Sequence, residues 1–275
     1  MTKPSVSAAW RRIRTIPKLW QKILWWLVRL CFLYGLICTI VWIIFPNDQA
    51  PAFSTLLARP EQVDAVKLLI MMLVYLPVCF LWEIFQFLPN KNLFRFVPCY
   101  FQNISVLFAW ATGFMGAFVN FYYSQYWWDS TIHFFGGGLC VMLGYEMFVA
   151  MQKRDKSVVP MNVLLIACAG MGFVIGTGWE LFEFIFDQFF GGDTQHWSLQ
   201  MAIDAGEVHP IFQPAKEYMS ADWQARYALM DTMSDIVLNS AGSVAFAIFL
   251  RIFHYYHRKK EIPVEFVPED AVAAK

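Results

Sequence analysis

Long apolar segments alternate with short polar ones along most of the chain. The runs at residues 23–45 and 66–88 carry few charges, and each is long enough to cross a hydrocarbon layer about 30 Å thick as a helix. Further apolar segments follow toward the C-terminus. The pattern predicts an all-α protein, a polytopic bundle of about six transmembrane helices, with spans at residues 23–45, 66–88, 104–122, 130–151, 161–187 and 231–253.

Composition excludes a water-soluble protein. Of the 275 residues, 58% are hydrophobic and 15% are charged, against roughly a half and a quarter in soluble domains. The formal net charge is zero, and no basic stripe interleaved with aromatic residues marks a nucleic-acid surface, so we expect no nucleic-acid partner. The six cysteines form no CxxC pair, which argues against a disulfide framework and against a cysteine metal site.

The distribution of Lys and Arg predicts the orientation. Since cytoplasmic loops carry the excess of these residues, both termini are expected inside. The chain then divides into a basic cytoplasmic segment (1–22), a membrane domain (23–253) with one long outer loop (191–230), and a cytoplasmic tail (254–275). The expected inner segments hold Lys3, Arg11, Arg12, Arg14, Lys18, Lys22, Lys91, Arg95, Lys153, Arg154, Lys156, Arg251, Arg258, Lys259 and Lys260, and the outer ones only Arg59, Lys67, Lys216 and Arg226.

Ionisable side chains interrupt the last three predicted spans. Such residues are rare within a membrane because desolvation of charge is costly, so they point to function. Within each span they recur at steps of three or four and share a helix face. They are Asp129 and His133 at the start of the fourth span, Glu180, Glu183 and Asp187 in the fifth, and Asp231 and Asp235 in the sixth, where the amide of Asn239 continues the same face.

The alternation of spans places all three polar faces near the outer side. Carboxylates held close together in a low dielectric need a bound cation or shared protons, and acids with His on facing helices hold metal ions in known bundles. An oxygen-rich set with one His suits a divalent Mg, Mn or Fe ion, or a catalytic Zn. The predicted metal ligands are Glu180, Glu183, Asp231, Asp235 and His133. His133 would act as a ligand or as a general base, and Asp129 would orient it. His133 and Asp129 are therefore the predicted catalytic pair.

Simpler roles exist for some of these residues. Asp129 and Asp231 also fit as N-caps of their helices, and His133 alone fits as a polar residue bonding across helices. Capping does not explain Glu180 and Glu183, which lie toward the end of a helix, where the dipole disfavours negative charge.

Two further sets of residues bear on the bundle. Small residues in the last three spans, among them Gly136, Gly137, Gly138, Gly172, Gly176, Ala241 and Gly242, predict close helix contacts. A second polar group lies toward the inner side: Arg29, Glu83, Gln86 and Glu146. These residues fit as interfacial or snorkelling side chains, or as the inner half of a relay across the bilayer.

Three motifs carry a family resemblance. Trp127-Trp128-Asp129-Ser130-Thr131-Ile132-His133-Phe134, Trp179-Glu180-Leu181-Phe182-Glu183-Phe184 and Asp231-Thr232-Met233-Ser234-Asp235 resemble the YjdF-like bacterial inner-membrane proteins. The resemblance implies integral residence in a bacterial inner membrane and supplies no reaction. A shorter similarity links the chain to VanZ-like proteins of glycopeptide resistance, although Glu180-x-x-Glu183 stands where those have Glu-x-x-Gln.

The residues favour three functions, in order. The first is a metal-dependent hydrolase in the outer leaflet that acts on a lipid or a lipid-linked envelope precursor, with membrane lipids as partners. The second is a proton- or cation-coupled transporter or permease, and the third is a non-catalytic membrane scaffold. A transporter needs a continuous polar path, so Glu83 and Glu146 would matter to it and not to the hydrolase.

Overall fold

The computed structural model describes residues 17–45, 65–88, 94, 97–125, 127–155, 157–192, 194–197 and 220–260. Within these residues every regular element is a helix and there is no strand. The predicted all-α fold is therefore confirmed.

Five helical stretches among the described residues are long and apolar enough to cross a membrane: Leu19–Ile44, Leu68–Phe85, Trp128–Gln152, Met161–Phe190 and Tyr227–His254. They correspond to the predicted first, second, fourth, fifth and sixth spans. The elements in chain order are α2 (Leu19–Ile44), α3 (Ala65–Tyr75), the 3₁₀-helix η1 (Leu76–Phe80), α4 (Leu81–Phe87), α5 (Cys99–Ala109), the π-helix η3 (Trp110–Phe118), α6 (Phe121–Ser124), α7 (Trp128–Asp155), α8 (Met161–Phe190), α11 (Ala221–Gln224) and α12 (Tyr227–Lys260).

The second predicted span consists of three helical pieces. Pro77 lies in the middle of this apolar run, at the start of η1. Proline has no amide hydrogen and its ring clashes with the preceding turn, so a regular α-helix does not continue through it. The chain passes from α3 through the tighter η1 to α4 and still keeps a span-length apolar stretch.

The third predicted span, 104–122, is not among the five span-length apolar stretches of the described residues, and the helix at this place has different bounds. Its helix begins at Cys99 after Pro98, changes from α to π winding at Trp110, and ends at Phe118. Thr112 Oγ1 donates to Phe108 O at 2.9 Å and to Ala109 O at 3.2 Å near the change, where a hydroxyl competes with the backbone for carbonyl groups. Asn120 then adopts a left-handed backbone (φ 73°) that reverses the chain.

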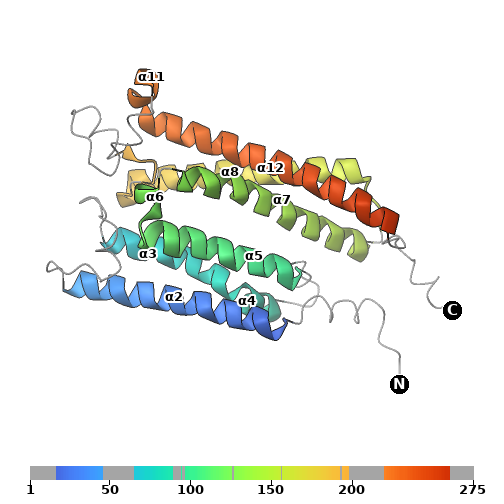
Figure 1. Ribbon diagram of the computed structural model, residues 1–275, viewed down its shortest axis with the longest axis horizontal. Helices are drawn as coiled ribbons and strands as arrows, with labels where there is room; N and C mark the ends of the chain where they lie inside the picture. The colour runs from blue at the N-terminus through green and yellow to red at the C-terminus, as the bar shows by residue number, and fades with distance from the viewer. Residues whose placement is uncertain are drawn as a thin grey trace.

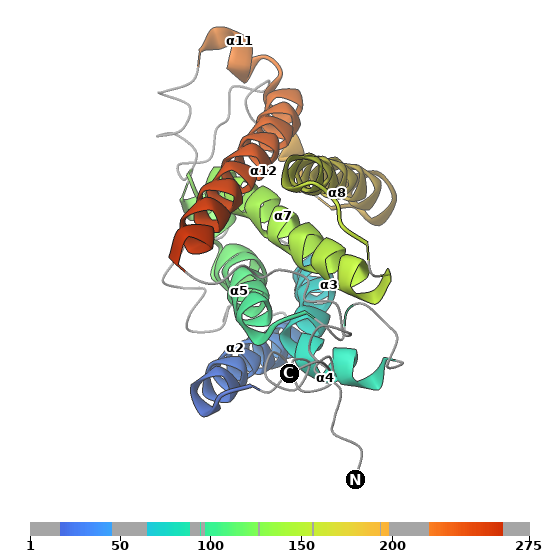
Figure 2. The same cartoon turned by 90° about the vertical axis from the view of Figure 1, so that its right-hand side faces the viewer.

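The helices lie side by side in two groups (Figures 1 and 2). One group contains α2, α3, η1, α5 and η3, and the other contains α7, α8 and α12, which pack on one another. In Figure 1, α2 begins at the end of the bundle where α12 ends, whereas α7 begins and α8 ends at the opposite end. This arrangement brings the starts of α7 and α12 and the end of α8 together, as the alternation of spans predicts. The assignment of that end to the outer side stays a prediction.

Glycines set the spacing of α7, α8 and α12. A Cβ atom on Gly137 would lie 2.0 Å from the backbone oxygen of Asn239, and one on Gly242 would lie 1.9 Å from that of Phe134. No other residue fits at such contacts without shifting a helix, because the obstructing atoms belong to the backbone. The close approach places the polar faces of these three helices against one another.

Candidate metal site

His133 lies at the centre of a group of acids from three helices. Its Nε2 atom is 3.5 Å from Asp129 Oδ1, one turn earlier on α7, and 3.8 Å from Asp235 Oδ2 on α12. Its Nδ1 atom is 3.5 Å from Glu180 Oε1 on α8. These distances lie at or beyond the outer limit of hydrogen bonding. The imidazole thus faces three carboxylates without a short bond to any of them.

The side chains form two overlapping sets that share His133. One set is Asp129, His133 and Asp235, and the other is His133, Glu180 and Glu183; in each, one ligand atom per residue lies within 4.8 Å of the others. Two ligands bound at 2.0–2.2 Å to one ion are at most about 4.4 Å apart. The sets are therefore close to the spacing that a metal ion requires.

Glu180 is the least satisfied of these acids. Its side chain is 5% exposed, and neither of its carboxylate oxygens has a hydrogen-bond partner among the described residues. Glu183, one turn later, accepts a hydrogen bond from the indole of Trp179 at 3.0 Å. A buried acid without a partner costs considerable free energy unless a cation or a proton compensates it.

Asp231 lies apart from both sets. It is one turn before Asp235 on α12, yet it belongs to neither group of converging ligand atoms. Because α12 begins at Tyr227, Asp231 is inside the helix and is not its N-cap. Asp129 is in the first turn of α7, where its charge complements the helix dipole.

Three residues of the cluster lie more than one turn from the nearest end of their helices. His133 lies about five residues from the start of α7, Asp235 about eight from the start of α12, and Glu180 about ten from the end of α8. At 1.5 Å per residue these offsets correspond to depths of roughly 7–15 Å from the helix ends. These three residues are consequently about one to three turns inside their helices, and buried charge there needs compensation.

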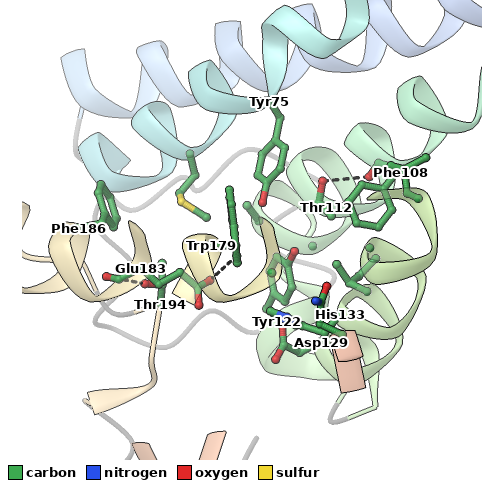
Figure 3. A pocket seen from close by; sticks show the side chains of 18 of the residues that line it. Tyr75, Phe108, Thr112, Tyr122, Asp129, His133, Trp179, Glu183, Phe186 and Thr194 are labelled. Atoms are coloured by element: carbon green, nitrogen blue, oxygen red, sulfur yellow. Dashed lines mark hydrogen bonds and ion pairs between the residues drawn. The ribbon is translucent and has the colours of Figure 1, made fainter. Parts of the chain in front are cut away.

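A cavity of about 230 Å³ adjoins the cluster between the two groups of helices. Asp129, His133 and Glu183 border it, and Tyr75 from α3 faces them across the space (Figure 3). Much of the remaining wall is apolar and includes Leu68, Met71, Ile132, Leu139 and Ile175. The arrangement is an apolar cavity with a polar, acidic side.

The loop after α8 contributes a histidine that periodicity does not single out. His196 is 7% exposed, has a left-handed backbone (φ 54°) and lines the same cavity. Asp187 anchors this loop by accepting hydrogen bonds from Thr194 N and Oγ1, both at 2.8 Å, and from Gln195 N at 2.9 Å. Asp187 thus holds the loop in place. His196 differs from an ordinary loop residue in its left-handed backbone and its burial.

The inner polar group forms local pairs. Arg29 Nη2 lies 2.6 Å and 2.7 Å from the two carboxylate oxygens of Glu83, and Arg29 Nε donates to Cys79 O at 3.0 Å. Tyr100 donates its hydroxyl hydrogen to Glu146. The side chain of Gln86 lies outside the described residues. These contacts join neighbouring helices and fit a structural role.

The donor set fits a divalent metal ion. On the Nδ1 side of His133 it offers oxygen ligands from Glu180 and Glu183, and on the Nε2 side it offers them from Asp129 and Asp235. Mg, Mn, Fe and Zn accept such combinations of carboxylate oxygen and imidazole nitrogen. The unpartnered oxygens of Glu180 provide ligand atoms that no described protein group uses. This buried group of His, Asp and Glu can therefore hold a metal.

These features define a polytopic helical membrane protein with a buried carboxylate and histidine cluster. The chain belongs to the family described as "Predicted membrane protein (DUF2238)", whose profile matches residues 28–256 and so includes every residue of the cluster. No curated protein and no solved structure matches the chain. The family match supports membrane residence, and the resemblance to YjdF-like and VanZ-like proteins stays a prediction.

Proposed function

We propose that this protein resides in a bacterial inner membrane with both termini in the cytoplasm, and that its cluster holds a divalent metal ion for hydrolysis of a lipid or lipid-linked envelope precursor. One observation carries the proposal: the two carboxylate oxygens of Glu180 are buried beside His133 with no hydrogen-bond partner among the described residues. A cation at that point would compensate the charge and use the free lone pairs.

Each residue of the cluster has a role in this proposal. Glu180 and Glu183 would hold the ion with His133 Nδ1. Asp129 and Asp235, 3.5 Å and 3.8 Å from His133 Nε2, would fix the orientation of the imidazole. A bound divalent ion supplies Lewis acidity and an acidic water molecule. Asp231, predicted as a ligand, would act at longer range by adding negative charge one turn away.

The adjoining cavity supports a lipidic substrate. Its wall is largely apolar, yet Asp129, His133 and Glu183 lie along one side. A site for a soluble polar substrate would not need such a wall, whereas an amphiphile places a polar group at the acids and apolar atoms against the remainder.

The pairing within the inner group disfavours the transporter alternative. Glu83 is paired with Arg29, and Glu146 accepts a hydrogen bond from Tyr100. A relay across the bilayer needs acids that exchange protons or ions with their neighbours, and acids fixed in local pairs suit that purpose poorly.

The test is lipid hydrolysis by purified protein. Wild type in detergent is incubated with a bacterial envelope lipid extract and with Mg, Mn, Fe or Zn, and the lipids are followed by mass spectrometry. We expect one lipid class to be consumed by wild type and by Glu146→Gln, a matched buried acid on α7 whose hydrogen bond Gln can still accept. Glu180→Gln should consume none.

Two outcomes would overturn the hydrolase. Hydrolysis that persists in Glu180→Gln would show that the cluster is not needed for the reaction. A lipid extract that stays unchanged with every metal would show that the protein does not hydrolyse these lipids. Loss of activity in Glu146→Gln would instead indicate a polar path through the membrane and favour transport.

A further inference from the structure

The cavity beside the cluster has an unusual charge distribution. No Lys or Arg is among the described residues that line it, whereas Asp129 and Glu183 both border it. Two histidines line it as well, His196 and His133, and His133 already faces three carboxylates. Most sites for phosphate or carboxylate groups present Arg, Lys or a helix N-terminus to the anion. The wall therefore disfavours an anionic group and favours a cationic one.

A bound metal does not reverse this preference. The two ligand sets contain four carboxylates, from Asp129, Glu180, Glu183 and Asp235, together with His133. If the acids are ionised and His133 is neutral, one divalent ion leaves about two negative charges uncompensated. The remaining charge still attracts a cation in a site with little water to screen it.

Aromatic side chains supply the second half of a cation site. Tyr75, Tyr122, Trp179 and Phe186 line the cavity from α3, α6 and α8. The ring centroids of Tyr75 and Trp179 are 5.8 Å apart with an interplanar angle of 40°, and Figure 3 shows Tyr75, Trp179 and Tyr122 around the same space. Aromatic walls next to carboxylates are the usual receptor for alkylammonium groups.

We propose that this cavity binds an organic ammonium group, and that the substrate of the proposed hydrolase carries one. The inference rests on the proposed function only in calling the bound molecule a substrate. The volume of about 230 Å³ exceeds that of an engineered cavity of roughly 150 Å³ that holds benzene, so a trimethylammonium group fits with room for adjoining atoms.

The experiment compares two molecules of the same shape and different charge. Calorimetry measures the binding of choline and of its neutral isostere 3,3-dimethylbutan-1-ol to purified protein in detergent, with and without chelator. We expect saturable choline binding at least about tenfold tighter than that of the isostere. Binding should be tightest after chelation, because the metal no longer offsets the acids.

Two variants and one control locate the binding site. Glu183→Gln keeps the side-chain shape, removes a charge, and should weaken choline binding about tenfold. Trp179→Leu removes a ring and should weaken it by a similar factor. Trp20→Leu removes an indole that is 55% exposed on α2 and should leave choline binding unchanged. Equal binding of choline and the isostere, or equal binding by all three variants, would overturn the proposal.

Competition identifies the source of the ammonium group. If micelles doped with phosphatidylethanolamine displace choline and those doped with phosphatidylglycerol do not, the group belongs to a lipid headgroup. If neither lipid displaces choline, the ammonium group belongs to a free amine, and this outcome also supports the cation site. Preferential binding of glycerol phosphate, or the absence of saturable choline binding, would overturn it. Choline binding without metal binding would refute only the metal centre, and metal binding without choline binding would refute only this inference.

Discussion

Glu180 has the least compensated carboxylate of the cluster. It is 5% exposed, and its carboxylate oxygens have no hydrogen-bond partner among the described residues. His133 Nδ1, at 3.5 Å, is too distant for a strong bond. An acid in this position destabilises the folded protein unless a ligand compensates it, so its removal should have opposite effects with and without that ligand.

Glu180→Gln should raise the midpoint of thermal unfolding of chelator-treated protein, because an uncharged amide is easier to bury. The gain should be roughly 1 kcal/mol or more. In excess metal the order should reverse, since the variant lacks a ligand. Intrinsic tryptophan fluorescence during heating measures the unfolding midpoint with chelator and the midpoint with excess metal. Glu146→Gln, at a buried and hydrogen-bonded acid, should show no metal-dependent reversal. A variant less stable than wild type in both conditions would show that Glu180 is satisfied within the protein.

The cluster was largely predictable from residue spacing. Asp129, His133, Glu180, Glu183 and Asp235 are brought together because each shares a helix face with its neighbour and the helices alternate in direction. Spacing could not separate Asp235 from Asp231, because both lie on one face of α12. Only the axial register of that helix against α7 decides which acid meets His133.

Residue His196 shows the limit of such reasoning. Its position depends on a loop held by Asp187 through three hydrogen bonds. A loop has no periodicity from which a shared face can be derived, so the sequence offered no signal beyond the presence of a histidine near the acids.

At the scale of helices, hydrophobicity predicted the five span-length apolar stretches found among the described residues, but it did not predict their ends. The last span was predicted to begin at 231, and α12 begins at Tyr227. Polar residues near a membrane surface are compatible with continued helix, so the apolar run marks the hydrocarbon layer and not the helix end. The change to π winding in η3 depends on packing and local hydroxyl bonding and has no signature in an apolar pattern.

Gly242→Ala should disrupt the contact between α12 and α7. The added Cβ would lie 1.9 Å from the backbone oxygen of Phe134, and a backbone cannot yield without moving the helix. We expect lower yield of folded protein and loss of several degrees in the unfolding midpoint, measured by size-exclusion chromatography and thermal scanning.

Gly178→Ala on α8 is the matched control for this substitution. A Cβ there meets nothing within 4 Å, so the variant should be neutral or slightly more stable, because Ala favours a helix over Gly by about 1 kcal/mol. Equal behaviour of the two variants would mean that the helices are not as close as described.

At the scale of the whole molecule, the direction of the helices determines which side the cluster faces. The ends of α7, α8 and α12 that carry the acids lie at one end of the bundle, opposite the start of α2 (Figure 1). The excess of Lys and Arg near the start of α2 predicts that the acids face the outer side.

Reporter fusions test this orientation. A reporter after Lys156 and one at the C-terminus should be active only as cytoplasmic fusions, and a reporter near Glu217, in the predicted outer loop, only as an extracytoplasmic one. An extracytoplasmic signal at Lys156 would place the acids on the cytoplasmic side and exclude an outer-leaflet substrate.

The metal content of the purified protein tests the central claim most directly. Protein purified without chelator should carry roughly one or two divalent ions per chain, as carboxylate sites in helix bundles do. Elemental analysis of wild type should find this stoichiometry, while Glu180→Gln combined with Asp235→Asn should lose the metal and keep the elution volume of folded protein. Wild type with no stoichiometric metal, and with no uptake of added Mg, Mn, Fe or Zn, would contradict the metal centre.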